Sequence, residues 1–152
     1  MVKLGKLVEF VTNLNLVALE NIDSWAENIR FNASGKSLGN GNIVLFRQEY
    51  DAVIYIERFP HQRHPAELLF GQVVAWLMDN DSEREEQNAA NPTVDADILD
   101  NSTADIEISV PFVEDVEAIP DANGPIEING QRYRLGDSSI NYAKTGRVVT
   151  HG

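Results

Sequence analysis

The sequence predicts an α+β protein, a small, mostly antiparallel sheet with two amphipathic helices packed on one face, plus a C-terminal β-hairpin extension. Residues 104–112 alternate apolar and polar side chains without interruption, as a strand with one buried face does. Residues 2–15 and 66–79 carry apolar side chains at helical spacing. The dipeptide Asn129-Gly130, between two short alternating runs, is a strong hairpin signal.

Length and composition indicate one compact core. The chain has 152 residues, of which 43% are hydrophobic and 24% charged. We expect a main domain over residues 1–118, and a C-terminal hairpin with a polar tail over residues 119–152 that acts as an arm between subunits. The chain has no cysteine, which fits a reducing cytoplasm. Its beginning matches neither a signal peptide nor a membrane span, so no membrane partner is expected.

The net charge of −12 is unevenly distributed along the chain. Residues 1–78 sum to −1, residues 79–127 to −14, and residues 128–152 to +3. This charge disfavours direct binding of nucleic acid, because affinity for phosphate comes mainly from clustered Lys and Arg. Three interpretations stay open: a solvated acidic face, charge matching between neighbouring copies, and a wall beside a DNA channel that avoids sticking to DNA.

The first half of the chain predicts one helix and two strands. Residues 2–15 form the helix, with the core positions Leu4, Leu7, Val8, Val11 and Leu14. Residues 24–32 form a strand, followed by a flexible connection over residues 33–42. The Gly-Lys-Ser string in that connection lacks the earlier glycine and the following helix of a phosphate-binding loop. Residues 43–59 form a long strand with charges on its outer face.

The second half predicts a helix and two further strands. Two prolines end the long strand and begin a helix over residues 66–79, with the core positions Leu69, Val73, Trp76 and Leu77. A polar surface loop follows over residues 80–92, and then strands over residues 93–99 and 103–112. As an antiparallel pair they stack four acids on their wet face, namely Asp95, Asp97, Asp105 and Glu107, and such like charges cost stability.

The end of the chain is expected to be an appendage. Residues 118–125 resemble a linker because they are rich in proline, glycine and short polar residues. The hairpin then covers residues 126–135, and a polar segment covers residues 136–152. We expect that segment to stay loose until a partner docks it.

Patterns for catalysis or metal binding are weak. His61 and His64 lie near Glu67, but prolines hold both histidines in a turn and no third ligand follows at the spacing of a zinc site. The four stacked acids lack the backbone carbonyl loop of a calcium site. No cysteine or Gly-x-Ser-x-Gly motif offers a nucleophile. We therefore expect no enzyme, no catalytic residue, no metal site and no cofactor.

Several strings of the chain resemble the tail completion protein R family of P2-like contractile-tailed bacteriophages. The most specific are Trp76 in its helix and the nine-position string at residues 98–106, Ile-Leu-Asp-Asn-Ser-Thr-Ala-Asp-Ile. The resemblance also includes residues 50–56, 59–60, 74–77 and 110–114. It covers roughly residues 1–117, and the hairpin beyond them is interpreted as a feature of this relative.

The resemblance implies a structural virion protein that completes or terminates the contractile tail tube and prepares the tail for head joining. By analogy with a tail terminator it acts as a homo-oligomeric ring, sixfold in our interpretation. The implied partners are the tail tube, the sheath and the head–tail connector, while DNA passes through without specific binding. The implied location is the head-proximal end of the tail in the virion, and the host cytoplasm during assembly.

Charge separation predicts the contacts between subunits. The basic residues expected there are Arg132, Arg134, Lys144 and Arg147. The acidic residues expected to meet them are Asp105, Glu107, Glu114, Asp115 and Glu117. Two other functions stay open: an acidic DNA mimic that occupies a nucleic-acid-binding host protein, and a metal-dependent hydrolase built on the stacked acids.

Overall fold

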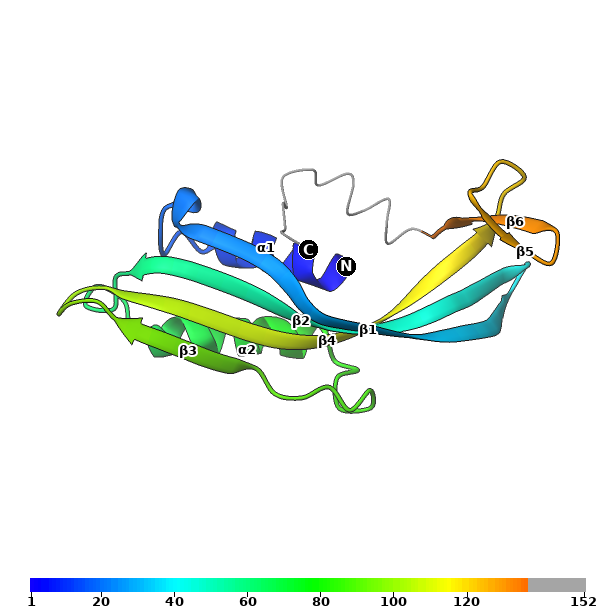
Figure 1. Ribbon diagram of the computed structural model, residues 1–152. Helices are drawn as coiled ribbons and strands as arrows, with labels where there is room; N and C mark the ends of the chain where they lie inside the picture. Colours follow the sequence, from blue (N-terminus) through cyan, green and yellow to red (C-terminus); the bar gives the residue numbers. More distant parts are fainter. Residues whose placement is uncertain (137–152) are drawn as a thin grey trace.

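The computed structural model describes residues 1–136, which form one antiparallel sheet of six strands and a layer of two helices (Figure 1). The strands lie in the order β1-β2-β4-β6-β5, and β3 pairs with β4. The predicted antiparallel sheet with two helices is confirmed. The elements in chain order are α1 (Val2–Asn13), the 3-10 helix η1 (Leu19–Asn21), β1 (Ile22–Gly39), β2 (Asn42–Phe59), α2 (Ala66–Asn80), β3 (Thr93–Ile98), β4 (Ala104–Pro120), β5 (Ile126–Ile128) and β6 (Gln131–Leu135).

Both helices pack against one face of β2 and β4, which we call the helix side. Alternate residues of these strands are apolar, so they reach the helix side together and join α1 and α2 in one core. Trp76 of α2 lies between Phe10 of α1 and Phe112 of β4, with ring centroids 6.4 and 6.3 Å away. Of the predicted core positions, Leu14 is only half-buried just after α1 ends, whereas the others are buried: Leu4, Leu7, Val8, Val11, Leu69, Val73, Trp76 and Leu77.

The sheet continues past the helices as an arm, which we define as residues 29–48 and 115–136 (Figure 1). The ladder between β2 and β4 runs from Phe59↔Ala104 in the core to Ile43↔Ala118 in the arm. The arm is therefore continuous with two strands that also lie under the helices. On β1 every residue from Glu27 to Gly39 is exposed.

Residues 33–42 are not the flexible connection expected from their Ser, Gly and Asn content. β1 extends to Gly39, and Asn40-Gly41 forms a two-residue hairpin turn with φ of 56° and 83°. Positive φ at both central residues is what a type I′ turn needs, and Asn-Gly is its preferred dipeptide. The polar residues before the turn lie on a strand that is solvated on both faces, so they carry no alternation to reveal it.

The linker expected over residues 118–125 was also wrong in part. β4 extends to Pro120, and its last three residues pair with Tyr133–Leu135 of β6. The predicted hairpin around Asn129-Gly130 is present, with φ of 50° and 81° at the turn. Because β6 is hydrogen bonded to β4, the hairpin is part of the main sheet.

The face of the sheet opposite the helices, which we call the open side, carries no helix of the described residues. Among residues 1–136, no helix has both the length and the apolar character needed to cross a membrane.

Candidate assembly surfaces

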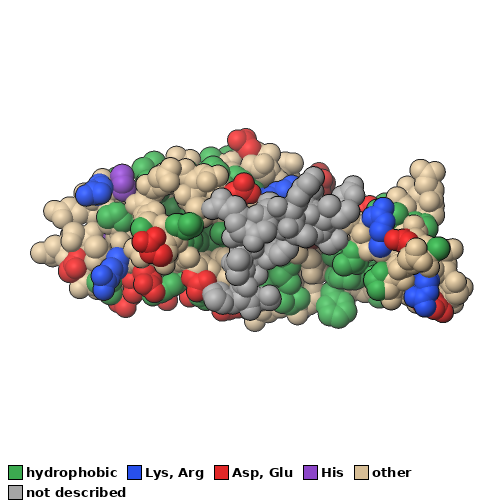
Figure 2. Space-filling model, turned by 90° about the horizontal axis from the view of Figure 1, so that it is seen from above, with side chains coloured by type: hydrophobic (Ala, Val, Ile, Leu, Met, Phe, Trp, Pro, Cys, Tyr) green, Lys and Arg blue, Asp and Glu red, His purple; other side chains and the backbone are tan. Residues whose placement is uncertain are grey.

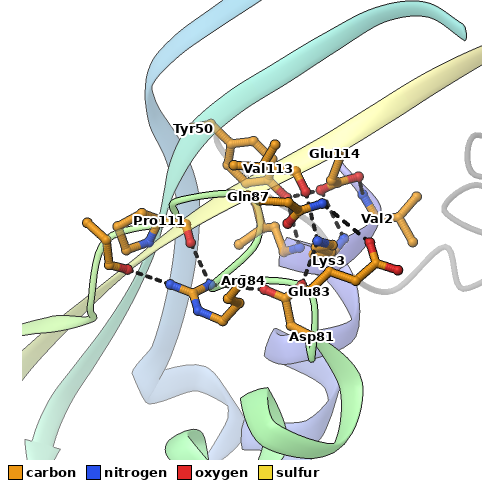
Figure 3. A network of polar contacts seen from close by, with 12 residues as sticks. Val2, Lys3, Tyr50, Asp81, Glu83, Arg84, Gln87, Pro111, Val113 and Glu114 are labelled. Carbon is orange, nitrogen blue, oxygen red and sulfur yellow. Dashed lines mark hydrogen bonds and ion pairs between the residues drawn. The ribbon is translucent and has the colours of Figure 1, made fainter.

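A buried carboxylate on β4 holds the start of α1 where the arm begins (Figure 3). Glu114 accepts the backbone N–H of Val2 at 3.0 Å and of Lys3 at 3.2 Å, and also accepts the hydroxyl of Tyr50. The Tyr50 oxygen in turn accepts the N–H of Leu4 at 3.1 Å. These are N–H groups of the first helical turn, which have no partner within the helix, and a negative charge there also suits the helix dipole.

Tyr50 stays a hydrogen-bond donor in this environment. Burial raises its pKa far above the usual value of a tyrosine, and the neighbouring negative charge of Glu114 raises it further. The phenol therefore stays protonated and keeps donating to Glu114.

A second set of charges joins both helices to β4 (Figure 3). Asp81, just after α2, has a side chain only 2% exposed, with Lys3 Nζ at 2.6 Å and Arg84 Nη1 at 3.0 Å. The two cations also donate to backbone carbonyls of β4, Lys3 to Val113 at 2.7 Å and Arg84 to Pro111 at 2.7 Å. The charged groups of this network are bonded to one another and to the fold, as in a structural network.

The open side of the sheet stacks acids as the sequence predicts. Asp95 lies opposite Glu107 and Asp97 opposite Asp105, beside Tyr55, around a shallow hollow of about 150 Å³. Asp105 accepts the Tyr55 hydroxyl at 3.1 Å, and this hydrogen bond raises the pKa of the phenol.

The side chains around this hollow do not form a set of metal ligands. Within the described part of the chain, no three Asp, Glu or His side chains converge closely enough to hold a metal ion. His61 instead lies 3.2 Å from the backbone oxygen of Asp100.

The predicted contact residues fall into different surroundings. Arg132 pairs with Glu127 at 3.3 Å and Arg134 with Asp121 at 3.8 Å, both within the hairpin region. Asp115 pairs with Arg47 of β2 at 2.9 Å. Figure 2 shows basic and acidic side chains close together on the arm. Lys144 and Arg147 lie outside the described residues.

Two predicted acids show the contrast between surface and interior. Glu117 is exposed on the arm, whereas Glu114 is 8% exposed and bound to the start of α1. The burial of Glu114 was predictable from the sequence. The even-numbered residues from Ala104 to Phe112 lie on the buried face, and Glu114 is the next residue in that alternation.

Exposed apolar side chains on the sheet edges were not predicted. Phe31 on β1 is 70% exposed and Ile98 on β3 is 66% exposed. Between α2 and β3 lies an apolar groove of about 310 Å³, lined by Phe70, Val73, Val74, Asn91, Pro92, Val94 and Ile108. Contiguous exposed apolar surface of this kind marks sites of contact with other proteins or with ligands.

The sheet extends into an arm, its buried charges stabilise the fold, and its exposed apolar side chains lie on the edge strands. This combination is typical of a structural assembly protein. The family model described as P2 phage tail completion protein R (GpR) matches residues 1–137, and the chain belongs to that family. The match includes the hairpin, so our expectation that the family resemblance stops near residue 117 was wrong. This is a family of structural proteins of phage tails and not an enzyme family.

A curated relative also comes from a phage. It is described as an uncharacterized 19.2 kDa protein in the rep-hol intergenic region of Haemophilus phage HP1 (strain HP1c1). It is 26% identical over 129 residues, which cover 85% of this chain and 78% of the relative. No solved structure matches.

Proposed function

We propose that the chain completes the contractile tail as a homo-oligomeric ring at the head-proximal end of the tail tube, which prepares the tail for head joining. The arm is the observation that carries this proposal. It extends β2 and β4 beyond the helices that cover the core, and its long edge strand is exposed. Such an extension adds little to a core but offers a large surface to a neighbouring copy.

The acidic open side fits a ring through which DNA passes. The stacked acids on β3 and β4 would repel phosphate and so keep the passing duplex from sticking. In this arrangement the ring meets the tail tube, the sheath and the head–tail connector with its other surfaces.

Contacts between subunits join the basic residues near the C-terminus to acidic ones on the sheet. The proposed basic residues remain Arg132, Arg134, Lys144 and Arg147. Asp105, Glu107, Asp115 and Glu117 are the acidic complements, whereas Glu114 contributes by fixing α1 in its own chain. Exchange of the internal pairs of Arg132, Arg134 and Asp115 for pairs between copies costs little, because exposed ion pairs are weak.

The mass of the particle tests the ring. Light scattering of the chain alone and mixed with the tail tube protein should give a defined oligomer, alone or on the tube. Phage that lack the gene should accumulate tails without heads. The proposal would be refuted by a chain that stays monomeric and does not bind the tail tube, together with normal head joining in phage without the gene.

An acidic DNA mimic is the second candidate, favoured by the stacked acids on the open side. It predicts a chain that acts as a monomer and competes with DNA for a nucleic-acid-binding protein. A competition assay with labelled duplex DNA separates it from the ring, because the ring requires no such competition.

A further inference from the structure

The sheet has two edges that no strand of residues 1–136 covers. β1 pairs only with β2, and β3 pairs only with β4, so these two strands form opposite edges of the sheet. Starting from the proposed homo-oligomer, we propose that the arm half of β1 in one copy, residues 28–39, pairs with β3 of the next copy. The sheet then continues from subunit to subunit.

The strand directions permit this pairing. Each neighbour in the series β1, β2, β4 and β3 is antiparallel, so β3 runs opposite to β1. Two copies placed side by side in the same orientation therefore bring β1 and β3 together as an antiparallel pair, with the helices of both on one side. A head-to-tail contact of this kind closes into a ring when its rotation divides a full turn.

The side chains match on the helix side of the sheet. Phe31 lies opposite Gln48, and Val94 lies opposite Ile108, so both Phe31 and Val94 are on the helix side. Val94 also lines the apolar groove beside α2. A groove of about 310 Å³ has room for a phenyl ring, and Phe31 is a 70% exposed aromatic that its own chain leaves largely in water.

Charges match on the open side. Arg30 lies opposite Glu49, on the same face as Asp51, while Asp95 and Asp97 project from the open side of β3. Residues 28–39 contain Arg30 and Lys36 and no acid, whereas β3 contains two acids and no base. The Arg30–Glu49 pair is 3.8 Å long with side chains 68% and 38% exposed, so it is readily exchanged for a new partner.

The same charges select the register. Without a shift along the strands, β3 would begin at the level of Trp25 and run past Ile22 of β1, which places Asp95 level with Asp23 on the open side. These two acids would then face each other, which is unfavourable. A shift toward the arm replaces that repulsion with attraction to Arg30 and Lys36.

The irregular edge of β1 limits its choice of partner. Register shifts occur between Glu27 and Arg30 and between Ala33 and Lys36. Bulges of this kind, with charged residues on the edge, discourage indiscriminate strand pairing. A partner strand must therefore fit the bulges and carry the opposite charge. β3 of a second copy carries the opposite charge.

A charge-swap experiment tests the pairing in full-length protein. R30E/K36E and D95K/D97K should each abolish the oligomer in light scattering and the rescue of phage that lack the gene. The combination of all four substitutions should restore the oligomer in light scattering, because the charges on the two proposed edges are again opposite. Circular dichroism checks that each variant is folded, and a combined variant no better than its parents would overturn the pairing.

Cross-linking gives a second readout that does not depend on charge. Since the chain has no cysteine, N32C/T93C places one thiol on each proposed edge. A short bismaleimide should join such copies in the oligomer or in purified tails into covalent dimers and larger species. The control N32C/E20C, with one thiol on β1 and the other in η1 just before it, should give no covalent dimer.

The outcomes separate the pairing from the ring. Oligomers or tails that contain the protein but give no N32C/T93C cross-link would overturn the edge pairing and leave the ring intact. If R132E/R134E abolishes assembly while R30E/K36E does not, the hairpin makes the contact and β1 does not. A wild-type chain that forms no oligomer and is missing from tails would overturn both.

Discussion

At the scale of single residues, Glu114 shows how a charge in a buried strand can serve the fold. Its two oxygens accept two N–H groups of α1 and the Tyr50 hydroxyl. In E114Q an amide N–H₂ replaces one acceptor oxygen. We expect the free energy of unfolding to fall by about 1–3 kcal/mol, because a buried donor then loses its partner.

Urea denaturation measures the effect of E114Q. The matched control is E117Q, on the same strand but exposed, which should change stability by less than about 0.5 kcal/mol. Equal stability of the two variants would contradict the assigned role of Glu114.

Asp100 governs the turn between β3 and β4 through its carboxylate. It accepts the N–H groups of Ser102 at 2.9 Å and Thr103 at 2.7 Å. These bonds lower the pKa of Asp100 from 3.8 to about 2, with the Ser102 bond as the largest cause. Because the folded pKa is depressed, the contribution of this turn is complete above pH 4 and is lost as the pH falls toward 2.

Carboxyl chemical shifts in an NMR titration should place the midpoint of Asp100 near pH 2. T103A removes one hydroxyl bond, at 3.0 Å, and should raise the midpoint part of the way toward 3.8. A midpoint unchanged from that of an ordinary aspartate would show that the turn is open in solution.

At the scale of elements, the Asn-Gly turn between β1 and β2 fixes the tip of the arm. Gly41 has φ of 83°, and a Cβ there would lie 3.0 Å from Cγ of Pro120. G41A should therefore cost about 1–3 kcal/mol, through the strained backbone and this contact. Hydrogen exchange of arm amides and urea denaturation should both report the loss.

Gly71 in α2 provides the opposite case. Its φ is not in the positive range, and nothing lies within 4 Å of a Cβ built there. G71A should raise the free energy of unfolding by up to about 1 kcal/mol, as expected for glycine to alanine on an exposed helix surface. Destabilisation by both substitutions to the same extent would mean that backbone conformation does not decide the difference.

Elements with one buried face were the predictable ones. Both helices, β2, and the strands around residues 93–112 followed from apolar spacing, because burial on one face imposes a period. The arm half of β1 was missed since both its faces meet water, which removes that period. The pairing of β6 with residues 118–120 was missed as well, because contacts between distant segments leave no local pattern.

At the scale of the whole molecule, the candidate surfaces were only partly predictable. The stacking of Asp95, Asp97, Asp105 and Glu107 followed from strand alternation and hairpin register. The apolar groove and the exposed Phe31 depend on which side of the sheet the helices cover, and no single segment encodes that. The proposed partners of Arg132 and Arg134 are still predictions.

The core is expected to determine folding, whereas the C-terminal hairpin is expected to serve assembly. No member of the main core cluster lies beyond Phe112 in the described chain. A chain truncated after Pro120 should therefore keep the near-ultraviolet circular dichroism of packed aromatic rings and unfold cooperatively. It should also lose rescue of phage that lack the gene, as an arm between subunits requires.

Failure of the truncated chain to fold would show instead that residues 121–152 are integral to the domain. Separate expression of both lengths, compared by circular dichroism and by recovery in tails, distinguishes the two results.

The continuity of β2 and β4 from the core to the tip has a mechanical consequence. A pull along these strands loads their rungs in shear, so many hydrogen bonds must break at once, whereas a push across the sheet bends it with little resistance. The projection thus behaves as a leaf spring, stiff lengthwise and compliant sideways. A spring of that kind can adapt to the shape of a surface that it contacts and still bear tension along its length.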